Sequence, residues 1–183
     1  MLNRIFALLF LIILSPIFLI VIITIVIEDG FPFFFIQKRV GINYTFFNIY
    51  KFRSMKKNTP NVATHLLINP DQYLFKIGKF IRKTSLDELP NLINIIKGEM
   101  VFVGPRPALY NQYDLMEYRV ATGVYKLKPG VTGWAQINGR DDITIEKKVQ
   151  LEEEYLFTKS LLFDFEIIFK TFKNVIFSKG VRH

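Results

Sequence analysis

The longest apolar stretch lies at the start of the chain, over residues 5–27, and only Ser15, Pro16 and Thr24 interrupt it. As one continuous helix it would be about 35 Å long, which is enough to cross the hydrocarbon core of a bilayer. It exceeds the apolar region of a secretory signal, and Glu28 and Asp29 follow it in place of a small-residue cleavage site. The pattern therefore predicts a membrane segment.

Pro16 lies near the middle of this stretch and predicts a bend. It lacks an amide donor and its ring clashes with the carbonyl four residues earlier, while Ser15 can hydrogen-bond a nearby carbonyl. Two interpretations fit these residues: a kinked transmembrane helix, or a helix that turns back and leaves on the side it entered. Taken alone, the residues favour the plain span, because the few flanking charges, such as Arg4, give little orientation signal.

The rest of the chain alternates between strand-like and helix-like patterns, which predicts an α+β fold that is mostly helical. We expect a membrane segment over residues 1–30 and one compact catalytic domain over residues 31–183. The predicted elements are a strand or interfacial segment at 31–36, a strand at 46–52, an irregular segment at 54–72, helices at 73–83, 89–97, 111–119 and 151–177, and a glycine-rich loop at 128–140. Gly98 is a suitable C-cap for the second of these helices.

The helix predicted at 73–83 alternates apolar residues with lysine and arginine. This pattern suits an interfacial helix whose apolar side meets lipid and whose charges meet anionic headgroups. It suits equally an amphipathic core helix with a solvated basic face. The sequence alone leaves both interpretations open.

Composition narrows the chemistry. The 183 residues include 24 Lys and Arg against 16 Asp and Glu, and the net charge of +8 favours a polyanionic partner such as an anionic lipid, a phosphorylated substrate or nucleic acid. The chain has no cysteine and only two histidines, His65 and His183, so it offers no thiolate chemistry and little material for a histidine metal centre. It lacks the phosphate-loop, Rossmann and HExxH motifs, and no nucleic-acid-binding module is recognisable.

Two adjacent carboxylates, Asp87 and Glu88, stand out because they follow a basic pair and precede a predicted helix. One interpretation is structural, since Ser85 and Glu88 have the spacing of a capping box. Pro90 makes that interpretation harder, because it would fall where the helix first needs an amide donor. A helix that begins nearer Pro90 leaves both acids at its threshold.

The other interpretation is catalytic. A carboxylate can attack a phosphoryl group to give an acyl phosphate, and its neighbour can help to hold Mg²⁺. Arginines then position the phosphate oxygens, and Arg82, Arg106 and Arg140 are the candidates. Arg106 lies between two prolines, and Pro107 restricts its backbone, which would help to aim its guanidinium.

Taken together, four motifs resemble one family. They are Ser15-Pro16, the segment KFRSM at 51–55, the block 82–107, and PGVTGWAQINGR at 129–140. In this order they are similar to the bacterial sugar transferases that act on polyprenyl phosphate, the small monotopic phosphoglycosyl transferases. Each motif alone would be a weak signal, whereas the set is specific and covers nearly the whole chain.

The resemblance implies a two-step reaction. Asp87 would be the nucleophile that takes a phosphosugar from a UDP-sugar and releases UMP, with Glu88 beside it and Mg²⁺ against both carboxylates. Polyprenyl (undecaprenyl) phosphate would then accept the phosphosugar, and downstream glycosyltransferases would use the product. We expect an N-acetylated amino sugar. The residues expected to bind substrate phosphates are Lys51, Arg53, Arg82, Arg106, Gln136 and Arg140.

The resemblance also changes the expectation for the membrane segment. In this family the Ser-Pro pair breaks the helix into a re-entrant hairpin, so Ser15 and Pro16 would turn the chain back. The catalytic domain would then lie at the cytoplasmic face of the bacterial inner membrane, among membrane lipids and without a nucleic-acid partner.

Several alternatives stay open at this level. The chain could be a non-enzymatic, basic, membrane-anchored module that tethers a partner or an anionic polymer. Lys51 and Arg53 could face lipid headgroups in place of a diphosphate. Trp134 could stack on uracil or belong to an interface or core, and His65 suits a loop or core position.

Overall fold

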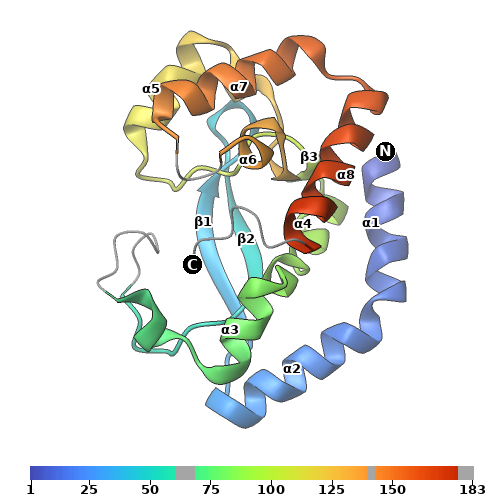
Figure 1. Cartoon of the computed structure of the whole chain (residues 1–183), viewed down its shortest axis with the longest axis vertical. Helices are drawn as coiled ribbons and strands as arrows, with labels where there is room; N and C mark the ends of the chain where they lie inside the picture. Colours follow the sequence, from blue (N-terminus) through green and yellow to red (C-terminus); the bar gives the residue numbers. More distant parts are fainter. Residues whose placement is uncertain (61–68, 140–142, 177–183) are drawn as a thin grey trace.

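The computed structural model describes residues 1–60, 69–139 and 143–176, with the side chains of Pro70 and Ile176 excepted (Figure 1). Its helices and strands confirm the predicted α+β fold that is mostly helical. The helices are α1 (Leu2–Ile13), α2 (Ser15–Asp29), α3 (Lys76–Lys83), α4 (Asn91–Lys97), α5 (Tyr113–Ala121), α6 (Trp134–Ile137), α7 (Ile145–Thr158) and α8 (Leu161–Ile176), and the strands are β1 (Phe34–Val40), β2 (Phe46–Phe52), β3 (Val101–Val103) and β4 (Gly130–Thr132).

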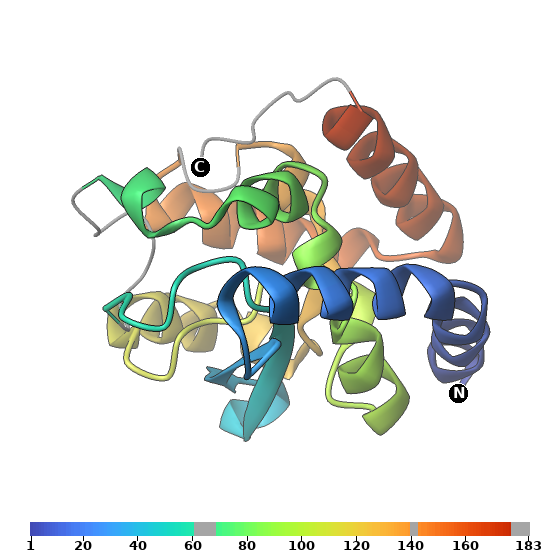
Figure 2. The same cartoon turned by 90° about the horizontal axis from the view of Figure 1, so that it is seen from below.

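The predicted bend in the apolar segment is confirmed. The helices α1 and α2 meet at Leu14 with an angle of 62° between them, and Figure 2 shows α1 turning away from the line of α2. The hydroxyl of Ser15 donates to the carbonyl of Ile12 at 2.7 Å, and Pro16 lies in the first turn of α2, where no amide donor is needed. Within the described ranges no single helix is long and apolar enough to cross a bilayer, whereas the bent pair together has the length and composition.

Both ends of the α1–α2 pair are hydrogen-bonded to the rest of the protein. Near the start of α1, the side-chain oxygen of Asn3 accepts from the backbone amide of Phe102 at 3.3 Å. Near the end of α2, the Glu28 carboxylate accepts from the amides of Lys76 and Ile77 at 2.6 and 2.9 Å and so caps the first turn of α3. The two ends therefore belong to one folded unit.

The helix pair also shares its core with the elements that follow it. Apolar side chains of α1, α2, β2, α3 and α4 pack into one cluster. Its buried members are Ala7, Phe18, Val21, Ile25, Phe47, Ile49, Phe52, Phe75, Ile81, Leu92, Ile95 and Met100. Burial of this size is the main stabilising term for the arrangement.

The antiparallel hairpin is fixed to the helix that follows the carboxylates. Strands β1 and β2 pair from Phe34 opposite Phe52 to Val40 opposite Phe46, and β2 has the predicted bounds. The buried Asn94 of α4 donates to the carbonyl of Asn48 at 2.7 Å, and its oxygen accepts from the amide of Tyr50 at 3.1 Å. These bonds hold β2 against α4.

Two predictions for the second half of the chain are wrong. The segment 128–140 contains β4 and α6, and β4 pairs in parallel with β3. The glycines allow this close approach, since a Cβ on Gly130 would lie 2.2 Å from the amide nitrogen of Gly104. The single helix predicted at 151–177 is two helices, because the chain turns between α7 and α8 and Ser160 accepts from the amide of Phe163 to start the second one.

Candidate functional site

Asp87 and Glu88 lie on a 3₁₀ turn, Leu86–Glu88, between α3 and α4. Ser85 precedes this turn in the left-handed region, with φ 56°, and its side chain makes no capping bond, so the capping-box interpretation does not hold. Pro90 is the N-cap of α4. Both carboxylates therefore stand at the threshold of α4, as Pro90 predicts.

Cations from two other segments contact the pair. The ammonium of Lys51, on β2, lies 2.7 Å from Oε1 of Glu88 and 4.0 Å from Oδ2 of Asp87. Nη1 of Arg106, in the loop after β3, lies 3.6 Å from the same Glu88 oxygen. The side chains of Asp87 and Glu88 are only 14% and 16% exposed, so the dyad is largely shielded from water and still reachable.

The surroundings of Asp87 raise its pKa to about 6. Burial is the largest cause, because it disfavours the charged carboxylate, and the neighbouring charge of Glu88 acts in the same direction. The positive charges of Lys51, Arg82 and Arg106 lower the pKa and offset part of this effect. Asp87 is thus mainly ionised at neutral pH. The nearby cations stabilise its negative charge only in part, and a strongly shifted pKa of this kind is typical of a reactive group.

A further cation, Arg39 on β1, belongs to this neighbourhood. Its guanidinium donates to the carbonyl of Pro107 at 3.0 Å and to the side-chain oxygen of Gln37 at 2.6 Å. Burial and the nearby Arg106 lower the pKa of Arg39 to about 10, while Glu88 acts in the opposite direction.

Arg39 was not among the site residues expected from the sequence, because no motif marks it. The hairpin register contains the missing signal. Phe35 pairs with Lys51 and Arg39 pairs with Phe47, so Arg39 and Lys51 share one face of the hairpin. Two strand predictions with the correct register would have placed both cations on the face that meets the dyad.

The arrangement is thus a largely buried carboxylate pair surrounded by cations, and comparison with known proteins gives the family of the chain. A profile of the bacterial sugar transferases matches residues 1–178. The chain belongs to the bacterial sugar transferase family. This membership confirms the resemblance and the predicted class of enzyme, a phosphoglycosyl transferase, over a non-enzymatic tether.

Relatives of this sugar transferase are of two lengths. It is 40% identical to the uncharacterized sugar transferase EpsL of Bacillus subtilis, over 92% of this chain and 82% of the relative. It is 38% identical to the exopolysaccharide production protein ExoY of Sinorhizobium fredii, over 95% and 83%. It is also 38% identical to the UDP-glucose:undecaprenyl-phosphate glucose-1-phosphate transferase of Escherichia coli, over 92% of this chain and 38% of that longer protein.

Arg53, which was expected to bind phosphate, anchors α2 in this sugar transferase. Its guanidinium pairs with the carboxylate of Asp29 and donates to the carbonyls of Gly30 at 2.5 Å and Pro32 at 2.6 Å. The side chain is buried. The structure therefore ties the end of the apolar helix pair to the end of β2 through Arg53, and it does not bring this residue to the dyad.

Gln136 and Trp134 of the 129–140 motif lie on α6, directly after β4, the strand that pairs beside the loop carrying Arg106. Gln136 donates to the carbonyl of Val131 at 3.3 Å. Trp134 donates to Glu154 at 3.0 Å and packs against Phe163, with ring centroids 4.9 Å apart, so its described contacts are with α7 and α8. Arg140 and His65 lie outside the described residues.

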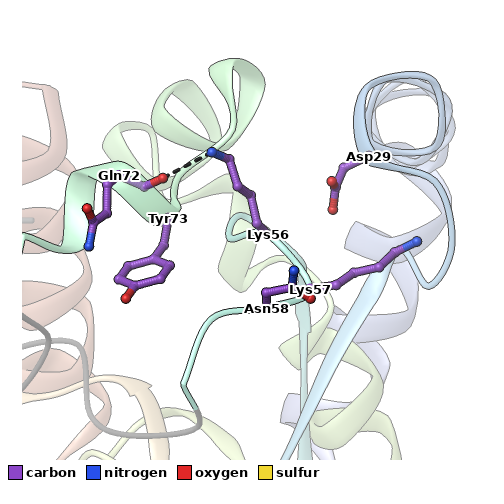
Figure 3. Close-up of a pocket in the computed structure, with 6 residues that line it drawn as sticks. All are labelled: Asp29, Lys56, Lys57, Asn58, Gln72 and Tyr73. Atoms are coloured by element: carbon purple, nitrogen blue, oxygen red, sulfur yellow. Dashed lines mark hydrogen bonds between the residues drawn. The ribbon is translucent and has the colours of Figure 1, made fainter.

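A hollow of about 540 Å³ lies beside the end of α2 (Figure 3). Its described lining residues are Asp29, Lys56, Lys57, Asn58, Gln72 and Tyr73. Lys56 reaches across to the carbonyl of Gln72 at 3.1 Å. Neither dyad carboxylate is among these residues, so the hollow is separate from the reactive pair.

The dyad suits a cation that takes few protein ligands. In the part of the chain that the structure describes, no group of three or more His, Cys, Asp or Glu side chains could hold a metal ion. Asp87 and Glu88 offer two carboxylates beside a partly open face. Mg²⁺ commonly takes one or two carboxylates and completes its shell with substrate phosphates and water, so the donor set fits that ion.

Proposed function

We propose that this sugar transferase moves a sugar phosphate from a UDP-sugar to undecaprenyl phosphate at the bacterial membrane, through a phosphosugar ester of Asp87. One observation carries the proposal: Asp87 has a raised pKa and lies beside Glu88, under the positive charge of Lys51, Arg82 and Arg106. A site of this kind presents a nucleophile and a positive environment for a diphosphate at the same place.

In the first step, a carboxylate oxygen of Asp87 attacks the phosphorus that bears the sugar. The Asp87 O–P bond forms, the P–O bond to the second phosphate breaks, and UMP leaves with the electron pair of that bond. In the second step, a phosphate oxygen of the lipid attacks the same phosphorus and the Asp87 O–P bond breaks. The products are undecaprenyl diphosphate sugar and the regenerated carboxylate.

The charged neighbours have separate roles in this proposal. Glu88 is held by Lys51 and contacts Arg106, so its orientation is fixed. Arg106 and Arg82 supply positive charge for the diphosphate, and Arg106 has the planar donor set that suits phosphate oxygens. Mg²⁺, held by Asp87 and Glu88, would neutralise the diphosphate and stabilise the departing UMP.

The hydrogen bonds at both ends of the α1–α2 pair support a re-entrant insertion. A helix that crossed the bilayer would place its ends about 30 Å apart on opposite sides. Here Asn3 and Glu28, near the two ends, are bonded to the same folded unit. In our proposal the pair therefore dips into the membrane and returns, and the catalytic domain lies on the cytoplasmic side, where nucleotide sugars are found.

Exposed apolar side chains of other elements support a shallow insertion of the domain. The helix α8 presents a row of them, and Phe80 of α3 is 55% exposed among lysines and arginines. The exposed residues of α8 are Leu161, Leu162, Phe165, Phe169 and Phe172. Such faces suit the lipid boundary. A long-chain lipid phosphate stays at that boundary, so the dyad would meet it there.

The sugar stays a matter for experiment. The relatives named for their substrates act on glucose, galactose or N-acetylgalactosamine, as undecaprenyl-phosphate phosphotransferases. The prediction of an N-acetylated amino sugar rests on overall resemblance of the sequence. A panel of UDP-sugars scored by UMP release would identify the donor, and the relatives' names place glucose, galactose and N-acetylgalactosamine first in that panel.

The covalent route is tested by UMP release without a lipid acceptor. Purified protein in detergent with Mg²⁺ and the UDP-sugar is expected to release one UMP per enzyme and to retain the phosphosugar on Asp87, detectable by intact-protein mass. Asp87→Asn should release none. The matched control is Asp71→Asn, because Asp71 is an exposed acid paired with Lys79 and should behave as the parent protein.

UMP that appears only after undecaprenyl phosphate is added would favour direct attack by the lipid. UMP release by Asp87→Asn at the parent rate would overturn the assignment of the nucleophile.

A further inference from the structure

The loop that carries Arg106 is held in an unusual way. Four consecutive carbonyls, from residue 105 to residue 108, each accept a hydrogen bond from a different donor on another segment. The donors are the amide of Gly130 to Pro105 at 2.9 Å, Nη2 of Arg119 to Arg106 at 2.9 Å, Nη1 of Arg39 to Pro107 at 3.0 Å, and the amide of Val40 to Ala108 at 3.0 Å.

The prolines on either side of Arg106 explain why outside donors are used. Pro105 and Pro107 have no amide hydrogen, so this segment cannot form a regular ladder with a neighbouring strand. Its carbonyls still need partners when they are shielded from water. Two of these donors are side chains: Arg119 donates to the carbonyl of Arg106 itself, and Arg39 donates to the carbonyl of the next residue, Pro107.

Arg119 is itself rigidly held. It lies on α5 and is 5% exposed, and it forms two parallel bonds to the Glu152 carboxylate of α7, at 2.8 Å from Nε and 2.6 Å from Nη2. A buried ion pair contributes little net stability compared with apolar residues of the same volume. Arg119 also donates to the carbonyl of Arg106. Through this bond the ion pair fixes the backbone of a residue whose side chain faces the dyad.

The position of Arg39 carries an energetic cost. Its Nε atom is buried and has no hydrogen-bond partner in the described structure, and its guanidinium lies beside the like charge of Arg106. Buried donors without partners are rare in native proteins, and they often mark a functional constraint. An apolar residue would fill this place without that cost and would leave the carbonyl of Pro107 without its donor.

We infer that Arg39 and Arg119 form an arginine clamp that positions Arg106 for the reaction. The clamp fixes the two peptide groups that follow Arg106, those of Arg106–Pro107 and Pro107–Ala108. The Arg106 guanidinium therefore stays directed at Glu88 and at the diphosphate of the donor. Arg39 and Arg119 are positioning residues, since they act through Arg106. The inference rests on the proposed function, because it assumes that Arg106 serves the transfer of the sugar phosphate.

A double-mutant cycle on UMP release separates this role from a general effect on folding. Arg106→Ala is expected to lower kcat/KM about 100-fold, as the loss of one preorganised charged donor does. Arg39→Gln and Arg119→Lys are each expected to lower it roughly tenfold, mainly in kcat, because misplacement of a catalytic group acts on the transition state. In the Arg106→Ala background the same two changes should cost less than about twofold.

Arg39→Gln and Arg119→Lys should have little effect in the Arg106→Ala background, because the clamp has no function without the Arg106 side chain. Full multiplication of the losses in the double variants would overturn it. Arg39→Lys keeps a donor and the charge and should recover most of the activity lost in Arg39→Gln. Thermal unfolding of each variant separates misfolding from mispositioning, and Arg39→Gln keeps the test available if a change at the buried Arg119 prevents folding.

Arg53→Gln is the matched control, since Arg53 is another buried arginine that holds backbone carbonyls and an acid, but on α2. Its effect should multiply with that of Arg106→Ala. The two proposals fail separately. Activity in Asp87→Asn would remove the proposed function, whereas an inactive Asp87→Asn together with an unimpaired Arg106→Ala would remove the clamp alone.

Discussion

Lys51 of β2 donates from Nζ to Oε1 of Glu88 at 2.7 Å, although the two residues are far apart in the sequence. The same ammonium is 4.0 Å from Asp87, so the two carboxylates of the dyad differ in how closely a cation contacts them. Glu88 is held in a tight ion pair, while Asp87 is influenced by charge at longer range. This asymmetry leaves Asp87 available to a phosphorus atom and explains how adjacent residues of similar chemistry can have different roles.

The raised pKa of Asp87 predicts the pH dependence of the first step. A nucleophilic carboxylate must be ionised, and burial raises its pKa to about 6. We expect kcat/KM for UMP release to rise with pH and to level off with a midpoint near 6, because the profile of kcat/KM reports the free enzyme. Stopped-assay rates between pH 4.5 and 8.5 would measure it. A midpoint near 4, the value of an ordinary aspartate, would contradict the assignment.

The charged neighbours should move this midpoint in opposite directions. Lys51 lowers the pKa of Asp87, so Lys51→Met should shift the midpoint upward from 6. Glu88 raises it, so Glu88→Gln should shift the midpoint downward, even though both variants turn over more slowly. Lys79→Met, on an exposed lysine of α3, is the matched control and should leave the midpoint in place. Equal shifts in one direction would show that the dyad is not coupled in this way.

Asp87→Asn should be inactive because it removes the nucleophile, and the raised pKa of Asp87 predicts that the same variant is more stable. Between pH 4 and 6 the folded protein holds this proton more tightly than the unfolded chain, so the free energy of unfolding falls as pH rises through that window. Above it, the ionised carboxylate destabilises the fold by about 3 kcal/mol. Asp87→Asn should therefore raise the unfolding temperature at pH 8 and leave it nearly unchanged at pH 4.

Glu88→Gln is the companion variant for this measurement. It breaks the ion pair with Lys51 and so should bring no gain in stability at pH 8. If both variants were stabilised equally, the effect would reflect removal of a negative charge in general and not the burial of Asp87.

Local signals account for what the sequence predicts correctly. Strand β2 mixes aromatic, β-branched and polar residues, Gly98 adopts the left-handed conformation that ends α4, and Pro16 lies where the apolar helix bends. The position of Asp87 at the threshold of α4 follows from Pro90 alone. Each of these features depends on residues within one or two turns of the chain.

The rest depends on contacts between distant segments. Strands β3 and β4 have three residues each and pair across the loop that carries Arg106, so no alternation is long enough to reveal them. Lys51 and Arg53 are two residues apart and look alike in sequence. Because β2 ends at Phe52, Lys51 stays on the face that meets Glu88, whereas Arg53 turns to Asp29. The arginine clamp likewise joins β1, α5 and the 105–108 loop, which only the folded chain brings together.

The re-entrant arrangement can be tested by labelling, since the chain has no cysteine of its own. Single cysteines at Leu2 and Lys57 lie near the two ends of the α1–α2 pair, and both side chains are exposed. Because both ends are bonded to one folded unit, a membrane-impermeant maleimide should label both positions in inverted inner-membrane vesicles and neither in intact spheroplasts. Ile13→Cys, at the bend and 68% exposed, should resist the reagent from both sides because lipid surrounds it.

Labelling of Leu2→Cys from the outside, with Lys57→Cys labelled only from the inside, would show that the segment crosses the membrane. That result would break the bond between Asn3 and Phe102, since the two residues would lie on opposite sides of the bilayer. The dyad chemistry would survive such a result, because Lys51, Asp87, Glu88 and Arg106 all follow the apolar segment. The measurement therefore tests the membrane arrangement independently of the reaction.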